Sequence, residues 1–312
     1  MVGTQSTAMV NKLLTNASYK INPVGYISEE IFPVVQVKQS TGLLGSYGNS
    51  HLRIETTITG GKGKYARVDT RSTSTQTYAI TKHGLSDLVT EEDYANVEEP
   101  FNAESDTTSE LMTKLWLGKE KGLADTLTDV TVLTNNVTLT GTDQYNDYAN
   151  SDPLGDFGTA RSTIYNAVGM APDTAIMSWA VWNTLRYHPD FLTALGYKDQ
   201  RPGGLTTDEL ARALDVERVL VGKAVYSSPK EGQADAIAAV WGKDIIFAVS
   251  PRTAAKGQIS LGYRFQQFSG PRRVFKNAVS NPPNAYEILV DDSYQQLVSA
   301  ANAGYLIKDA IA

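Results

Sequence analysis

The chain has three histidines, His51, His83 and His188. Histidine is the side chain most often used as a metal ligand and as a catalytic base near neutral pH. None of the three stands beside another histidine or an acid at the spacing that places two metal ligands on one face of a predicted helix. We therefore expect surface or packing roles for all three. The chain has no cysteine, which excludes thiol nucleophiles, iron–sulfur clusters and cysteine-bound zinc.

Two glycine-containing motifs are superficially similar to catalytic or phosphate-binding turns. Residues 84–88 (Gly-Leu-Ser-Asp-Leu) lack the second glycine of the Gly-x-Ser-x-Gly turn that carries the nucleophile in many hydrolases. Residues 60–64 (Gly-Gly-Lys-Gly-Lys) lack the spacing of a phosphate-binding loop and do not precede a predicted helix. We interpret the second motif as the tip of a hairpin.

Acidic residues occur in adjacent pairs at 91–92, 98–99 and 291–292. Neighbouring side chains point in different directions, whereas glycoside chemistry needs two carboxyl groups that face each other across the substrate. No EF-hand calcium loop is present. The sequence thus offers no positive support for an enzyme, and we predict a non-enzymatic protein with no catalytic, cofactor-binding or metal-binding residues.

The composition is that of a folded protein outside the membrane. Of 312 residues, 41% are hydrophobic and 20% are charged, which argues against global disorder. The longest apolar run, residues 236–241, is far shorter than the roughly 20 residues that a membrane-spanning helix needs. The first residues lack the basic and apolar regions of a secretion signal. The net charge of −6 argues against a dedicated nucleic-acid binder. We expect a protein that is assembled in the cytosol.

Residues 1–40 do not resemble the start of a compact domain. Two prolines, at 23 and 33, favour extended backbone in the residues before them. Apolar side chains are scattered, and Val34, Val35 and Val37 have no obvious core of their own. The pattern predicts an arm that lies along another surface.

A long hairpin is predicted next. Apolar and polar residues alternate over 52–59, as is typical of a half-buried strand. Glycines in 60–63 allow a turn, and a second extended stretch follows over 64–80. Eight threonines between 56 and 81 favour strands because their branched β-carbons suit a pleated surface.

A long helix and an α+β segment follow. Thr107–Glu110 has the pattern of a capping box, so we expect a helix over 107–128. One face of this helix carries an apolar stripe, which comprises Leu111, Leu115, Trp116, Lys119, Leu123 and Leu127. Gly118 and Gly122 lower helix propensity and suggest that another element approaches closely. Residues 136–257 alternate short helices and strands, and long strands are predicted at 259–268 and 286–297. The fold class is therefore α+β.

Charge is segregated along the chain. Residues 83–110 hold nine acids and no lysine or arginine, whereas residues 51–82 hold six bases and two acids. Residues 256–276 add five bases and no acid. Such runs are usually solvated faces, but a basic hairpin laid over an acidic surface of a second copy would fix how the copies fit together. The residues predicted for this intersubunit contact are Lys62, Lys64, Arg67, Arg71, Glu91, Glu92, Glu98 and Glu99.

The order of these parts resembles the major capsid proteins of tailed bacteriophages, whose Hong Kong 97-type capsid fold also builds encapsulin shells. The resemblance spans nearly the whole chain. It rests on the hairpin 52–80, the helix 107–128, residues 173–178 with the helix 179–187, and the segments 259–265 and 303–308. It implies an N-arm at 1–40, an extended E-loop at 41–85, a peripheral domain with a spine helix at 86–135 and 258–298, and an axial domain at 136–257 and 299–312.

The resemblance also implies a function. Hexamers and pentamers of the chain would close into an icosahedral shell around double-stranded DNA, contacted without sequence specificity, in a virion assembled in the host bacterial cytoplasm. A scaffolding protein, a portal and a decoration protein are the further partners to consider, and no membrane is involved. The start of the chain has no charged helical stretch, so we expect a separate scaffolding protein or none. Some capsids of this fold join an E-loop lysine to an asparagine. Here Lys62 or Lys64 would meet Asn277 or Asn284, although ordinary surface charges explain these lysines better.

Two alternatives stay open at this point. An encapsulin-type nanocompartment would hold a cargo enzyme in place of a genome, and fold alone does not separate it from a phage capsid. The Thr-rich hairpin and the plain start favour the capsid. An enzyme with an unrecognised site would need a cleft with convergent acids of perturbed pKa.

Overall fold

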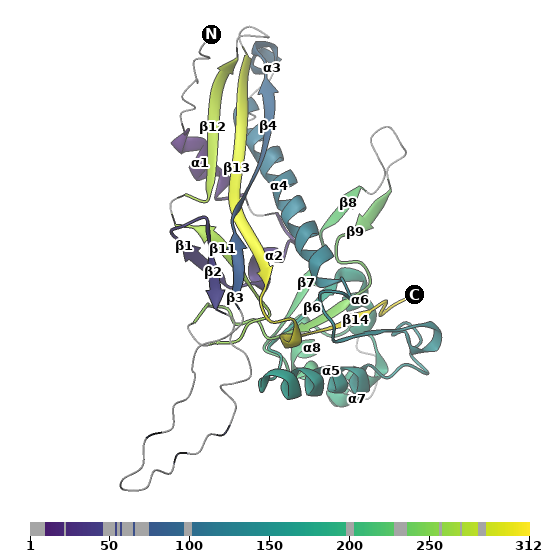
Figure 1. Ribbon diagram of the computed structural model, residues 1–312. Helices are drawn as coiled ribbons and strands as arrows, with labels where there is room; N and C mark the ends of the chain where they lie inside the picture. Colours follow the sequence, from purple (N-terminus) through teal and green to yellow (C-terminus); the bar gives the residue numbers. More distant parts are fainter. Residues whose placement is uncertain are drawn as a thin grey trace.

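The structure is a computed structural model (Figure 1) that describes residues 10–21, 23–45, 54, 57, 65, 75–96, 102–197, 203–227, 236–255, 258–268, 270–279 and 285–312. In the described part, two five-stranded sheets are joined by one long helix. Each sheet has its own set of neighbouring helices.

The first sheet is built around β13 (Ala285–Val298), the longest strand. Strands β12 (Arg272–Val279) and β4 (Thr81–Val89) flank the first part of β13, both antiparallel to it. Strand β11 (Gly262–Gln267) pairs with its last part, and β1 (Val34–Val37) adds to β11 in parallel. The predicted long returning strands are confirmed.

Helix α4 (Ala103–Leu127) lies along this sheet. The predicted start at Thr107 is wrong, because Asn102 caps the helix and its side chain accepts from the backbone N–H groups of Glu104 and Ser105, both at 3.1 Å. Asp106 reaches back to the Asn102 N–H at 3.2 Å. The hydroxyl of Thr108 instead donates to the Glu104 carbonyl inside the helix, at 2.7 Å. An asparagine cap one turn earlier therefore displaces the threonine cap.

The second sheet has the order β5 (Asn136–Thr138), β14 (Gly304–Lys308), β10 (Ile245–Ala248), β6 (Thr174–Ser178) and β7 (Arg218–Gly222). Four helices belong to this part of the chain: α5 (Pro153–Val168), α6 (Trp179–Leu185), α7 (Pro189–Ala194) and α8 (Thr207–Leu214). The predicted caps are confirmed, since the Ser178 hydroxyl accepts from the Val181 N–H and Thr206 forms a capping box with Glu209. Smaller elements are the hairpin β8 (Val225–Ser227) and β9 (Ile237–Ala239), and the 3-10 turns η2 (Gly141–Asp143) and η3 (Ala301–Ala303).

The core shows why α4 unites the molecule. Leu111 and Met112, in its first half, pack with apolar residues of β13 in one cluster. Leu123 and Leu127, in its second half, pack in another cluster with residues of the second sheet such as Ile246. A single helix thus contributes to the packing of both sheets, and a third cluster fills the space between the second sheet and its helices.

The N-terminal segment packs on its own subunit. It contains α1 (Lys12–Ser18) and α2 (Ser28–Ile31). Ile31 and Phe32 are fully buried in the cluster that includes the second half of α4. The surface along which this part of the arm lies is that of its own subunit. Val34, by contrast, is exposed, because β1 adds to the edge of the sheet through its backbone.

The predicted hairpin is described mainly at its base. Strands β2 (Thr41–Gly45) and β3 (Thr75–Ala79) pair antiparallel, with Gly45 opposite Thr75. The predicted tip, residues 60–63, lies outside the described residues. After β3 the chain runs directly into β4 and then into α3 (Glu91–Asn96), at the far end of the first sheet (Figure 1).

Candidate site at the junction of the arm, the long helix and the sheet

The residues predicted for the intersubunit contact are only partly described. Glu91 and Glu92 lie exposed on α3. The other six, Lys62, Lys64, Arg67, Arg71, Glu98 and Glu99, lie outside the described residues. The nine residues of β4, about 30 Å of extended chain, separate the end of the hairpin base from α3. The contact between the basic and acidic segments stays a prediction.

The basic segment 256–276 is not a solvated face. Each of its four described bases forms an ion pair within the chain, and the pairs are Arg264–Glu29, Arg272–Asp292, Arg273–Asp291 and Lys276–Glu104. Two of these acids come from β13, one from the first turn of α4 and one from the arm. Folding therefore neutralises a charge excess that is visible only along the sequence.

Adjacent acids at the centre of β13 serve opposite faces of the sheet, as predicted for neighbouring side chains. Asp291 pairs with Lys82 of β4 at 2.6 Å and with Arg273 of β12 at 3.3 Å. Asp292 points to the helix side, where it lies 3.8 Å from the Lys119 Nζ and 3.5 Å from Arg272. Both carboxylates are almost completely buried.

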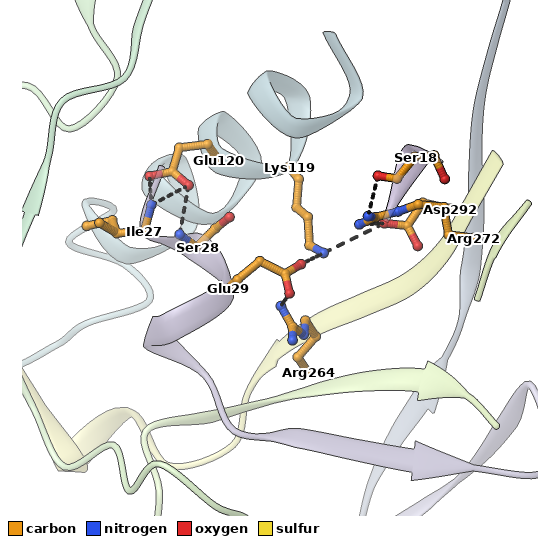
Figure 2. Close-up of polar contacts among 9 residues, drawn as sticks. All are labelled: Ser18, Ile27, Ser28, Glu29, Lys119, Glu120, Arg264, Arg272 and Asp292. Atoms are coloured by element: carbon orange, nitrogen blue, oxygen red, sulfur yellow. Dashed lines mark hydrogen bonds and ion pairs between the residues drawn. The ribbon is translucent and has the colours of Figure 1, made fainter. Parts of the chain in front are cut away.

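Lys119 is the centre of a buried ionic cluster (Figure 2). It extends from α4 to Glu29 of α2, and the other carboxylate oxygen of Glu29 contacts Arg264 of β11. Arg272 joins the cluster through Asp292 and donates to the Ser18 carbonyl at the end of α1, at 3.5 Å. The cluster therefore connects both arm helices to α4 and to three strands of the sheet.

The cluster shifts the ionisation of its members. Burial is the largest influence on Glu29 and would raise its pKa, but the charges and hydrogen bonds of Lys119 and Arg264 outweigh it and lower the pKa. Burial lowers the pKa of the Lys119 ammonium, since the neighbouring carboxylates only partly compensate. Buried charges need partners because desolvation costs several kcal/mol per ion. The arm supplies one of the partners that this site requires.

Glu120, the next residue, makes a second and separate attachment (Figure 2). Its carboxylate accepts from the Ile27 N–H at 3.0 Å and from the Ser28 N–H at 2.7 Å. It also accepts from the Trp241 indole N–H at 2.7 Å, next to the second sheet. Glu120 is completely buried. One carboxylate thus accepts from two backbone N–H groups at the start of α2, where the N-cap residue Ile27 offers no side-chain acceptor.

No sequence pattern predicts this junction. The spacing of residues places Lys119 in an apolar stripe, where a buried cation in need of an anion is the better interpretation. No sequence pattern predicts the role of Glu120, because it accepts from backbone groups of a segment more than 90 residues away. The arrangement offers ion pairs and hydrogen bonds that hold segments together.

A serine, a histidine and an aspartate also meet near α7, an arrangement that superficially matches a hydrolase triad. The His188 Nε2 lies 3.1 Å from the Ser151 Oγ, and the Nδ1 lies 3.6 Å from an Asp190 carboxylate oxygen. The Asp190 backbone N–H donates to that Nδ1 at 3.3 Å, and the Ser151 hydroxyl donates to the Asp147 carbonyl at 2.7 Å. These contacts favour the tautomer with the imidazole proton on Nε2, in which the ring donates to Ser151. A general base must accept from the serine, so the contacts favour a structural role, and burial lowers the pKa of His188.

The described ranges contain neither a metal-ligand cluster nor a membrane-spanning helix. Among those residues, no group of three histidine, aspartate or glutamate side chains is placed to hold a metal ion. His83 is stacked on Tyr294, with 4.6 Å between ring centroids. No helix in the described part of the chain has the length and apolarity to span a bilayer.

Comparison with known proteins places this geometry in context. The chain is 24% identical over 308 residues to the major capsid protein of Burkholderia phage BcepMu, and the match covers 96% of each chain. A phage-related protein from Bordetella bronchiseptica RB50 has a similar structure, with a TM-score of 0.74, 24% identity and coverage of 97% of this chain and 98% of the other. The capsid of cyanophage P-SCSP1u gives a TM-score of 0.56 at 9% identity, with coverage of 90% and 86%. The chain has the Hong Kong 97-type capsid fold.

No protein-family model matches the chain. The capsid fold, the α+β class and the predicted resemblance to phage major capsid proteins are nevertheless confirmed. The predicted function as a phage major capsid protein is better supported than the encapsulin alternative, because a phage major capsid protein matches over 96% of its length. In a capsid fold, the buried junction of Lys119, Glu120 and the arm is a structural element of the subunit.

Proposed function

We propose that this chain is the major capsid protein of a tailed bacteriophage, and that its copies assemble as hexamers and pentamers into an icosahedral shell around double-stranded DNA. The observation that carries the proposal is the match to a phage major capsid protein over 96% of both chains. The proposed role is structural and not enzymatic. In support, the contacts of Ser151 and His188 favour a tautomer in which the imidazole donates to the serine and does not accept from it.

The two sheets support a proposed division into domains. We assign the first sheet and α4, the spine helix, to the peripheral domain, and the second sheet with α5 to α8 to the axial domain. The N-arm is residues 1–40. We place the end of the E-loop at residue 80 and not at 85, because β4 begins at Thr81 and pairs with β13.

Contacts between copies are proposed to join the basic E-loop to the acidic end of a neighbour's peripheral domain. The exposed positions of Glu91 and Glu92 on α3 support this assignment. The hairpin base and α3 lie at opposite ends of the first sheet (Figure 1), which favours a contact between copies over one within a chain.

A charge exchange tests this contact. Changing Lys62, Lys64, Arg67 and Arg71 to glutamate should abolish shells in electron micrographs while the circular dichroism spectrum of the subunit stays unchanged. Adding the reverse changes, Glu91, Glu92, Glu98 and Glu99 to lysine, should restore shells, since the attraction is recovered with opposite signs. The matched control changes the exposed Arg252, which is paired with Glu217 in the second sheet region, to glutamate. Shells that form normally from the first variant would exclude the contact. The wild-type contact should also weaken at high salt, because exposed charges are screened beyond about 8–10 Å.

The contents of the shell separate a capsid from a nanocompartment. We propose that the wild-type shell belongs to a virion, is assembled in the host bacterial cytoplasm and packages DNA through contacts without sequence specificity. A scaffolding protein, a portal and a decoration protein are its proposed further partners. Nuclease-protected DNA of uniform length in particles from infected cells would support the capsid. A bound cargo enzyme without DNA would support the encapsulin alternative.

A further inference from the structure

A pocket of about 290 Å³ lies beside the buried ionic cluster. Its lining includes Tyr19 and Glu29 of the arm, Trp116 of α4, and Gln266, Arg272 and Asp292 of the first sheet. A water molecule takes about 30 Å³ in the liquid, and drug-sized ligands occupy pockets of about 300–1,000 Å³. The pocket therefore has room for a small ion with some water.

Buried donors exceed buried acceptors around this pocket. The Trp116 Nε1 and the Arg272 Nε have no hydrogen-bond partner among the described residues, and the same holds for the Arg264 Nε in the adjoining ionic cluster. Against these three donors stands one unpaired acceptor, the Asp292 Oδ1. Proteins seldom leave buried polar groups unpaired, so the surplus suits an acceptor from outside the chain.

Arg272 is firmly oriented but weakly bonded. Its side chain is only 9% exposed, and its guanidinium carbon lies over the rings of Tyr19 and Trp116, at 5.4 and 5.2 Å from their centroids. Among the described residues its hydrogen bonds go to the Ser18 carbonyl and to Asp292, both at 3.5 Å, which is long for such bonds. A guanidinium has five N–H donors. Most of the donors of this one are available, and the two aromatic rings hold them in place.

The ionic cluster also carries an excess of positive charge (Figure 2). It has three cations and two carboxylates, which are Lys119, Arg264, Arg272, Glu29 and Asp292. Asp291 lies on the other face of the sheet with bases of its own, and Glu120 serves the start of α2. Burial is the main cause of the lowered pKa of Lys119, and the charge of Arg264 adds to it. A buried charge without a counter-charge is costly, so one more negative charge would be favourable here.

We propose that this pocket binds a small oxyanion of the size of inorganic phosphate. Two N–H groups of a guanidinium match two oxygens of an oxyanion, and an indole N–H only donates. The Asp292 Oδ1 opposes an anion, but it is one group against three donors and the excess charge. Because Tyr19 and Glu29 belong to the arm, the anion would strengthen the attachment of the arm to α4 and the sheet. All these residues lie in one subunit, so the inference does not rest on the capsid function.

Isothermal titration calorimetry with sodium phosphate tests the site on full-length, dispersed subunits. Sodium chloride keeps the ionic strength constant, so that general screening does not change during the titration. The wild type should show saturable binding of about one phosphate per subunit. Trp116→Phe keeps a ring next to Arg272 but removes the indole donor, and Arg272→Lys keeps the charge but removes the guanidinium fork. Each should weaken binding at least about tenfold, because hydrogen bonds to charged groups are among the stronger ones.

The matched control is Arg273→Lys, the same change at the next residue of β12. Arg273 pairs with Asp291 on the other face of the sheet and its side chain is 41% exposed, so phosphate affinity should stay that of the wild type. Circular dichroism would check that each variant is folded. Absence of saturable binding to the wild type would overturn the proposal whatever the variants do, and would mean that water serves the unpaired donors. Equal affinities of wild type and folded Trp116→Phe would also overturn it, because the phosphate would then be bound elsewhere.

Discussion

Removing the Glu120 carboxylate is the most direct perturbation of the arm junction. The variant Glu120→Ala deletes an acceptor that is completely buried and that holds the Ile27 and Ser28 N–H groups and the Trp241 indole. These donors belong to the arm and to the region next to the second sheet. Loss of these three hydrogen bonds should loosen the arm and the region around Trp241 from α4.

The size of the effect follows from the three donors. Leaving one buried donor without a partner costs about 1–3 kcal/mol, so three give a gross cost of about 3–9 kcal/mol. Removal of the buried charge itself recovers part of that cost, and water entering the space satisfies some donors. We therefore expect the free energy of unfolding to fall by about 3–5 kcal/mol, the range typical of breaking a buried polar or ionic group.

Urea unfolding of disassembled subunits, followed by tryptophan fluorescence, measures the difference. The control is Glu110→Ala on the same helix, where the carboxylate is exposed and pairs with Lys114 one turn away at 2.9 Å. That pair should contribute little to stability, because solvent screens ion pairs at the surface. A loss below about 1 kcal/mol for Glu120→Ala would refute the argument that this carboxylate anchors the arm.

Two further predictions concern titration and reactivity. The pKa of Glu29 is lowered in the fold, so its ionised form stabilises the protein above the unfolded value of about 4.3, and this contribution is lost as the pH falls through the folded pKa. The gap in melting temperature between wild type and Glu29→Gln should thus be large at pH 7 and close in acid; a gap that is constant with pH would contradict the ion-pair cluster. Ser151 should not react with a fluorophosphonate probe, because its hydroxyl donates to the Asp147 carbonyl; labelling that disappears in Ser151→Ala would show an activated serine.

Local signals made the second half of the chain predictable. Ser178 and Thr206 cap helices through their own neighbours in sequence, so their patterns fix where those helices begin. The start of α4 is not predicted, because Asn102 and Thr107 both have cap patterns and lie five residues apart, and only the contacts in the first turn of the helix decide between them. In that turn Asn102 has both donors within reach of its side chain.

Long-range pairing could not be predicted from single segments. Glu29 and Lys119 are 90 residues apart, and Arg264 is further still. Counting charges along the chain therefore suggested a basic face at 256–276, whereas the sheet brings acids from three other segments to those bases. The order of the elements was enough to predict the fold, because the arm, the hairpin, the long helix and the returning strands each have a local sequence pattern.

The central claim is that this chain builds a closed shell, and negative-stain electron microscopy tests it most directly. The protein would be expressed alone and together with the genes that flank its own. We predict closed isometric particles of uniform size in at least one preparation. Dispersed subunits in both preparations, with a circular dichroism spectrum that shows them folded, would contradict the claim.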